Sequence, residues 1–207
     1  MFIEDISSKK DEEILTIIND YNLKVNNGAF KNITHVIDRS SFVDMQIKHY
    51  INIYLSIVPR FKQKQIIKTM SIVDDGLKLS KNNDFDEFKE NYLKIKDEFA
   101  NDLFEKYNYV FENYLVNYIF KTPNMFMSRD LMGSYAEMLI YYNMIKFSMI
   151  GTVGSLRDNI SESDLVLVIS TISRGVEHNK VNTASLKTLI DKCSFNNLSN
   201  LIPLILN

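Results

Sequence analysis

Residues 85–121 read FDEFKENYLKIKDEFANDLFEKYNYVFENYLVNYIFK, and no proline or glycine interrupts the chain from residue 77 to 122. Large side chains recur here every three or four residues, which is typical of one face of an α-helix. They are Phe85, Phe88, Tyr92, Ile95, Phe99, Phe104, Tyr107, Phe111, Tyr114 and Tyr118. The repeat slips in phase near Ala100, so the stretch is either one long helix or two helices broken near residue 100, and we expect a long helix with a local adjustment. Because each buried ring contributes on the order of 2–3 kcal/mol, the stretch predicts the central helix of the fold.

The rest of the chain has the same helical spacing and only three prolines and six glycines. Further helices are expected over residues 11–21, 41–58, 66–73, 128–150, 161–176, 183–190 and 198–206. Ser41, Ser128 and Ser161 are the expected N-caps, Asp74-Asp75-Gly76 is expected to form a turn, and Gly151 is expected to end its helix. The sequence thus predicts one all-α domain over residues 1–207, an irregular multi-helix bundle around a long central aromatic-rich helix.

Composition excludes several classes of protein. The 207 residues are 45% hydrophobic and include 13 Phe and 11 Tyr, too many for a disordered chain. Basic and acidic residues number 24 and 26, so there is no general basic surface and we expect no nucleic-acid partner. No secretory signal opens the sequence, and the most apolar region, residues 138–154, is interrupted by Asn143 and Lys146. We therefore expect no membrane partner and a cytoplasmic location.

Metal and nucleophile motifs are largely missing from the sequence. The single cysteine, Cys193, excludes an internal disulfide framework, a cysteine-type zinc site and a self-contained iron–sulfur cluster. No Glu-x-x-His pair precedes His35, His49 or His178, which excludes a helix-bundle di-iron site. We interpret Cys193 as a small buried hydrophobe and expect neither a metal nor a cofactor in this chain.

A polar cluster stands at the end of the helix expected over residues 161–176. Arg174 and His178 are i,i+4 neighbours, and Glu177 follows Arg174 by three residues, so the three side chains can converge. They could hold a carboxylate or orient a substrate lysine, with His178 as a proton carrier. The alternative is a solvated helix end, where the helix dipole favours a histidine.

Methionines are concentrated in residues 125–149. An adaptable surface for a protein partner would explain them, because thioether chains repack easily. The alternative is that they fill gaps in an aromatic core. The six residues are Met125, Met127, Met132, Met138, Met144 and Met149.

Three segments resemble the bacterial lysine-N-methylases that methylate flagellin. They are ENYLVNYIFK at residues 112–121, YAEMLIYYNMIKFSMIG at 135–151 and SRGVEHN at 173–179. Their order and spacing agree with that family over residues 85–190, whereas residues 1–80 match loosely. The resemblance is to the C-terminal helical half, so residues 81–207 are expected to form the helical core of the domain.

That resemblance implies S-adenosylmethionine as the methyl donor and an iron–sulfur cluster held by a cysteine cluster in the N-terminal half of the full-length family. The cysteine cluster is missing here. The chain is therefore expected to be either the C-terminal half of a longer methylase or a short relative, and in both cases to transfer no methyl group by itself.

Two functions follow as hypotheses. In the first, the domain binds flagellin or another protein substrate, Glu177 or His178 takes the proton from the substrate lysine, and aromatic rings face the methylated ammonium. Its expected substrate-binding residues are Arg174, Glu177, His178, Tyr114, Tyr118, Tyr135 and Tyr142. In the second, the chain is a stand-alone interaction module that forms homo- or hetero-oligomers through the methionine-rich helix or the apolar tail.

Overall fold

The computed structural model describes residues 39–80, 84–121 and 130–177, together with isolated positions between residues 13 and 27 and between 184 and 204. Ser128, His178 and Cys193 lie outside the described residues, and only isolated positions are described in the helices expected over 11–21, 183–190 and 198–206.

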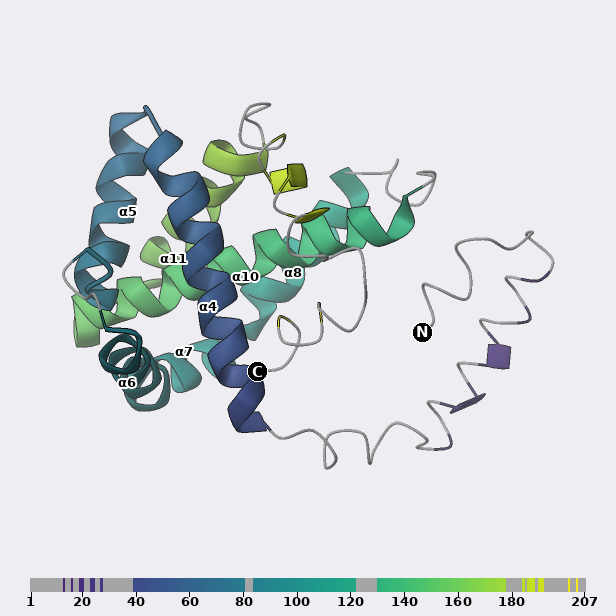
Figure 1. Ribbon diagram of the computed structural model, residues 1–207, viewed down its shortest axis with the longest axis horizontal. Coiled ribbons are helices and arrows are strands. Elements are labelled where there is room, and N and C mark those ends of the chain that lie inside the picture. The colour runs from purple at the N-terminus through teal and green to yellow at the C-terminus, as the bar shows by residue number, and fades with distance from the viewer. Residues whose placement is uncertain are drawn as a thin grey trace.

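All described secondary structure is helical, which confirms the all-α prediction (Figure 1). No strand occurs between residues 39 and 177 where the chain is described. The α-helices are α4 (Arg39–Ile57), α5 (Lys64–Leu77), α6 (Phe85–Ile95), α7 (Asn101–Lys106), α8 (Asn108–Lys121), α10 (Leu131–Leu156) and α11 (Glu162–Ile172). Two π-helices, η2 (Lys96–Ala100) and η4 (Ser173–Glu177), and two 3-10 turns, η1 (Val58–Arg60) and η3 (Arg157–Asn159), complete the set.

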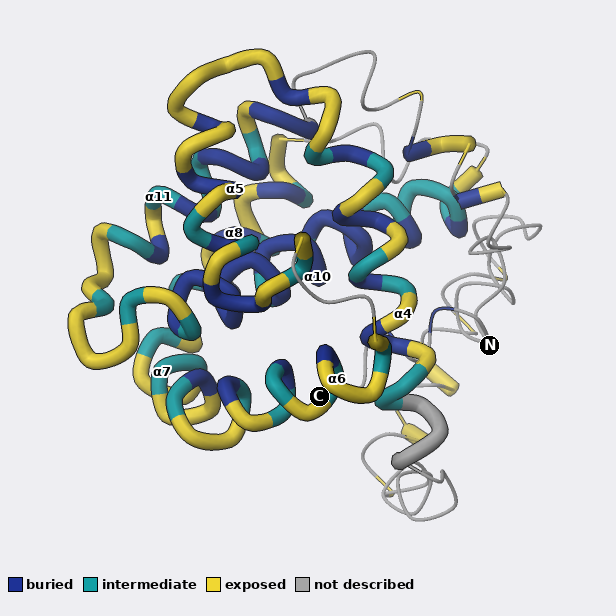
Figure 2. Tube along the Cα trace, turned by 60° about the vertical axis from the view of Figure 1, so that its left-hand side comes forward, coloured by how far each residue is buried: buried dark blue, intermediate teal, exposed yellow. Residues whose placement is uncertain are grey.

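The central helix is α10, and not the aromatic stretch 85–121. Helices α4, α5, α6, α8 and α11 all pack on α10, and Figure 2 shows it as the buried axis of the bundle. From Met138 to Val153 only Tyr142 and Lys146 are not buried. A helix that is apolar on all sides is stable only when it is enclosed, which is why this segment takes the middle of the fold.

The aromatic stretch forms two helical segments instead of one: α6, η2 and α7 follow one another without a break from residue 85 to 106, and α8 follows after Tyr107. The phase slip near Ala100 is the π-helix η2, whose wider turn absorbs one extra residue and keeps the large side chains on the inner face. A break follows at Tyr107, where φ −110° and ψ 26° end α7. The expected local adjustment near residue 100 is thus confirmed, whereas the break at Tyr107, which makes α8 a separate helix on α10, was not expected (Figure 1).

Helices α5 and α10 cross in very close contact at glycines. A Cβ atom placed on Gly76 would overlap the carbonyl oxygen of Gly151 and lie 2.8 Å from the backbone nitrogen of Ser155. A Cβ on Gly151 would lie 2.7 Å from Cγ1 of Val73. The expected turn at residues 74–76 and the expected helix end at Gly151 are therefore wrong: both glycines lie inside helices, where they permit close packing, and Lys78, at φ 57°, ends α5.

Helix α4 packs its tyrosines on the middle of α10. Tyr50 Oη donates to Asn143 Oδ1 at 2.7 Å, and Asn143 Nδ2 donates to the carbonyl oxygen of Leu139 at 2.7 Å, so this buried amide is paired. The rings of Tyr50, Tyr54, Phe88 and Tyr92 surround Phe147 at centroid distances of 5.4 to 6.4 Å. The inner face of α4 includes Ile53 and Ile57, whereas Leu55 is exposed.

Helix starts agree in part with the expected caps. The backbone N–H of Ser161 donates to the Asp164 carboxylate at 2.8 Å, which confirms the start of α11. Asp130 caps α10 by accepting from the N–H of Gly133 at 2.8 Å, two residues after the expected Ser128. Helix α4 begins at Arg39, ahead of the expected Ser41.

We predict that Gly76→Ala destabilises the protein by about 3 kcal/mol or more, because the added methyl group forces α5 away from α10. Urea unfolding followed by circular dichroism measures the change in the free energy of unfolding. Ser155→Ala, at an exposed position beside the same crossing, is the control and should change stability by about 0.5 kcal/mol or less. Equal effects of the two substitutions would show that the crossing does not limit stability.

Candidate functional site

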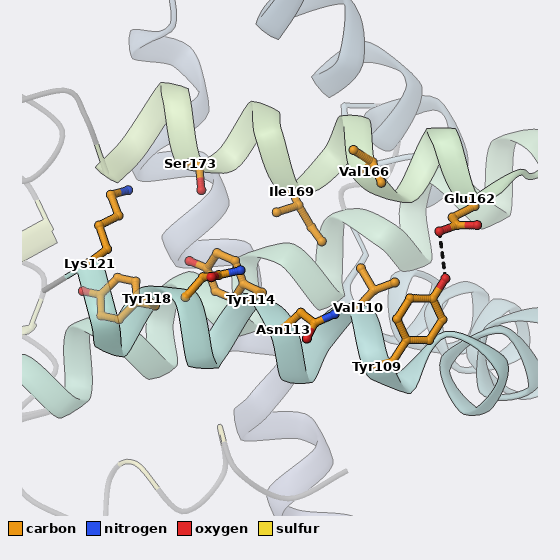
Figure 3. Close-up of a pocket in the computed structure, with 11 residues that line it drawn as sticks. Tyr109, Val110, Asn113, Tyr114, Tyr118, Lys121, Glu162, Val166, Ile169 and Ser173 are labelled. Atoms are coloured by element: carbon orange, nitrogen blue, oxygen red, sulfur yellow. Dashed lines mark hydrogen bonds between the residues drawn. The ribbon is translucent and has the colours of Figure 1, made fainter.

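A groove runs between α8 and α11, both of which lie on α10 (Figure 3). Its volume is about 420 Å³. Helix α8 contributes most of the lining and α11 the opposite wall, and η4 adds one residue at the far end. The lining residues are Tyr109, Val110, Asn113, Tyr114, Asn117, Tyr118, Lys121, Glu162, Val166, Ile169 and Ser173.

The floor of the groove is aromatic. Tyr114 and Tyr118 are buried on α8 with ring centroids 6.3 Å apart, and Tyr118 packs on Tyr141 of α10 at 5.8 Å. The Tyr141 hydroxyl donates to Glu137 at 2.7 Å, which fixes that ring from behind. These contacts make the floor rigid, since each ring is held by its neighbours.

One end of the groove carries a carboxylate. Glu162, the first residue of α11, accepts a hydrogen bond from Tyr109 Oη at 2.7 Å, and the two exposed side chains bridge the helices (Figure 3). The pKa of Tyr109 is raised, first because this hydrogen bond holds the phenol proton and then through desolvation and the charge of Glu162. A carboxylate at a helix N-terminus also interacts favourably with the helix dipole.

The rim and far end are more polar than the floor. Asn113 and Asn117 are exposed one turn apart on α8, and Lys121 lies at the far end (Figure 3). The side chain of Val166, on α11, is 53% exposed. From Tyr109 to Lys121 the groove extends for about 18 Å of helix rise, the length of about five residues of extended peptide.

The structure brings only some of the predicted site residues together. Tyr114 and Tyr118 line the groove, and Ser173, next to Arg174, lies at its far end. Arg174 is exposed on η4. Glu177 ends η4, but its side chain and all of His178 lie outside the described residues, so the convergence of the Arg174/Glu177/His178 cluster stays a prediction.

Tyr135 and Tyr142 do not line the groove. Both are half-buried on α10, and burial raises the pKa of each hydroxyl. Tyr142 lies in a separate pocket between α7, α8 and α10. For the methionine-rich segment, the structure favours the gap-filling alternative over the partner surface, since four of the six methionines are buried in the core. They are Met132, Met138, Met144 and Met149.

Sequence reasoning missed Tyr109, Glu162 and Val166. Tyr109 falls outside the three-and-four repeat of the neighbouring rings, and an aromatic residue on the solvent side of a helix is a signal that could have identified it. Glu162 directly follows the expected N-cap Ser161, where a carboxylate indicates no more than the start of a helix. Its role in the groove depends on how α8 and α11 are placed on α10, which the local sequence does not reveal.

The helices and the aromatic groove define the protein as an all-α domain with a groove on its surface. Among the described residues no group of three or more His, Cys, Asp or Glu side chains could hold a metal ion, and no described helix has the length and hydropathy needed to cross a membrane.

The family of the FliB lysine N-methylase C-terminal domain matches residues 1–204, so the chain belongs to this family, as the resemblance implied. The match includes residues 1–80. No curated protein and no solved structure shows significant similarity to the chain.

We predict that Glu162→Ala lowers the pKa of the Tyr109 hydroxyl toward its ordinary value of about 10, because the acceptor that stabilises the protonated phenol is removed. Nuclear magnetic resonance of tyrosine ring carbons over a pH series measures the shift, and Tyr109→Phe assigns the resonance. Glu98→Ala, at an exposed position on η2, should leave the resonance unchanged. A Tyr109 pKa that does not move in Glu162→Ala would contradict the hydrogen bond.

Proposed function

We propose that this domain binds the protein substrate of a lysine N-methylase, and that the groove between α8 and α11 holds the segment bearing the lysine. The observation that supports the proposal most is the combination of an aromatic floor with a carboxylate at one end, in a chain whose family is named for lysine methylation. Flagellin is the substrate that the sequence resemblance favours.

A lysine side chain suits this groove chemically. Its four methylene groups can lie along the apolar and aromatic surface of Tyr114, Val110 and Val166, while its ammonium reaches Glu162 at the rim. An aromatic surface also accommodates a methylated ammonium, because the attraction between a cation and a ring does not require an N–H donor. Both the substrate and its methylated product therefore fit the same floor.

Methyl transfer requires that the lysine first lose its proton. The described group placed to take this proton is Glu162, because it faces the ammonium in this arrangement. Glu177 and His178 follow Ser173 at the opposite end of the groove by four and five residues, so they would take the proton only from a lysine bound at that end. S-adenosylmethionine would supply the methyl group, and we assign no described residue to it. The single cysteine does not fit the iron–sulfur cluster implied for the full-length family, so that cluster would come from residues outside this chain.

We predict that Val166→Arg weakens flagellin binding by about tenfold, because a long cationic side chain fills the groove and repels the substrate lysine. Isothermal titration calorimetry with flagellin and the full chain measures the dissociation constant. Leu55→Arg is the matched control: Leu55 is 55% exposed on α4, against 53% for Val166, and lies outside the groove. Acetylation of the flagellin lysines should reduce binding in the same way, because it removes their charge.

Two results would contradict the proposed groove. The first is flagellin binding that Val166→Arg and Leu55→Arg change equally. The second is flagellin that does not bind the unmodified chain at all.

We further predict that the chain alone, mixed with flagellin and S-adenosylmethionine, yields no methyl-lysine detectable by mass spectrometry. The physical reason is that one cysteine cannot ligate the cluster that the family resemblance implies. Methyl transfer by this chain alone would contradict the proposal that the domain binds the substrate while other parts of the enzyme supply the cluster.

A second candidate function is that the domain binds a partner protein and has no part in methylation. The observation that favours it is the exposed apolar surface of α8 outside the groove, where Phe120 is 79% exposed one turn after Val116. The two functions differ in their dependence on lysine. Binding through Phe120 and Val116 would survive acetylation of the partner, whereas binding in the groove would not.

A further inference from the structure

The geometry points to a second site, a pocket between η2, α7, α8 and α10 that binds a small anionic ligand with an aromatic or other planar body. The ligand's carboxylate or phosphate group would lie between Lys96 and Lys146, and its planar part against Phe104, Phe111 and Tyr142. This inference does not depend on the substrate groove, with which the pocket shares no lining residue.

The pocket is concave, and both aromatic and polar side chains line it. Its volume is about 340 Å³, enough for a small molecule. One wall is aromatic and the other contains ammonium, amide and carboxylate groups. The lining residues are Lys96, Asp97, Asn101, Phe104, Asn108, Phe111, Tyr142 and Lys146.

Lys146 is placed unusually for a lysine. It is the one charged residue between Met138 and Val153 of α10, the most buried part of the molecule. Its ammonium lies 5.4 Å from the ring centroid of Phe104 and 5.5 Å from that of Tyr142, so the two rings position the cation at the pocket wall.

The π-helix η2 supplies the second cation. Lys96 and Asp97 are its first two residues, and both line the pocket together with Asn101, which follows η2. Asn101 Nδ2 donates to Asp97 Oδ1 at 3.4 Å, so that carboxylate already has a partner beside it. Single π-helical turns inside α-helices occur frequently at functional sites, and here the turn directs a lysine toward Lys146.

The charges in the pocket favour an anion. Two lysines face one aspartate, and the positive charge of Lys96 acts on Lys146. Desolvation first, and then this repulsion, lowers the pKa of Lys146 to about 8. An anion bound between the two ammonium groups would offset both effects, so binding should raise the pKa of Lys146. The other titratable groups facing Lys146 are Asp97 on η2 and Tyr142 on its own helix.

The aromatic wall defines the rest of the ligand. Phe111 meets Phe104 edge to face at 5.2 Å and Tyr142 at 6.0 Å, so three rings form a fixed apolar corner. A planar group packs well in such a corner, and Asn108 adds an amide at its edge. The site therefore fits an aromatic acid or the phosphate ester of a planar group better than an aliphatic acid of similar size.

Benzoate, phenyl phosphate and benzamide are the probes that test this site. We expect benzoate or phenyl phosphate to bind the full chain with a dissociation constant of about 1 mM or lower, measured by nuclear magnetic resonance or calorimetry at pH 7. The tighter of the two identifies a carboxylate or a phosphate as the natural anionic group. Benzamide, which has nearly the shape of benzoate but no charge, should bind at least about tenfold more weakly.

Lys146→Met should weaken binding of the anionic probe by about tenfold or more. The variant should stay folded, because methionine suits a partly buried position on α10. Lys106→Met is the matched control, since Lys106 also lies on a ring, 5.0 Å from the centroid of Tyr107, but outside the pocket. Binding of the anionic probe should also fall as the pH rises from 7 to 9 through the pKa of Lys146, and this fall should be absent in Lys146→Met.

The inference would be overturned by no binding of either anion, by equal binding of benzoate and benzamide, or by equal losses in Lys146→Met and Lys106→Met. Thermal unfolding of each variant separates a lost site from a lost fold, and a folded Lys146→Met protein with unchanged affinity would also exclude the site.

Discussion

The contact between α5 and α10 is the constraint on which the rest of the structure depends. Gly76 of one helix and Gly151 of the other leave no room for a side chain, so the two backbones meet directly. Gly154 extends the same contact, since a Cβ there would lie 3.2 Å from the carbonyl oxygen of Gly76. Close backbone contact fixes the angle and height of α5 on α10 more strictly than interleaved flexible side chains would.

Once α10 is enclosed in this way, its remaining faces support both candidate sites. Helices α8 and α11 each pack on α10 and leave the substrate groove between them. On another face, Tyr142 and Lys146 reach the pocket formed with η2 and α7. The buried helix is thus the shared support of two surface features that are separated by α8.

Much of the fold could be predicted from the sequence, because the three-and-four spacing of large side chains determines helices locally. The N-cap Ser161 and the irregularity near Ala100 were also predicted, because both depend on residues that are close in the sequence. The position of the central helix was predicted wrongly. The many rings in residues 85–121 favoured that stretch, whereas α10 is central because it is apolar on all sides. Gly76 and Gly151 look like helix ends in the sequence, and only the partner helix shows that they are contact points. For the groove, Tyr114 and Tyr118 were predicted from the resemblance, whereas Tyr109, Glu162 and Val166 depend on the packing of distant segments.

The π-helix η2 makes the spacing of residues, more than their identity, essential to this fold. Rings before it, Phe88 and Tyr92, contact Phe147 of α10, and rings after it, Phe104 and Phe111, contact Lys146 and Tyr142 of the same helix. If residues 96–100 formed regular α-helical turns without losing a residue, one group would be rotated relative to the other by about 100°, and only one group could then face α10. The π turn absorbs this extra residue, so deletion of one residue from 96–100 would leave a regular α-helix with both groups still facing α10. Insertion of a further residue has no such compensation and is the change of length that this segment should tolerate least.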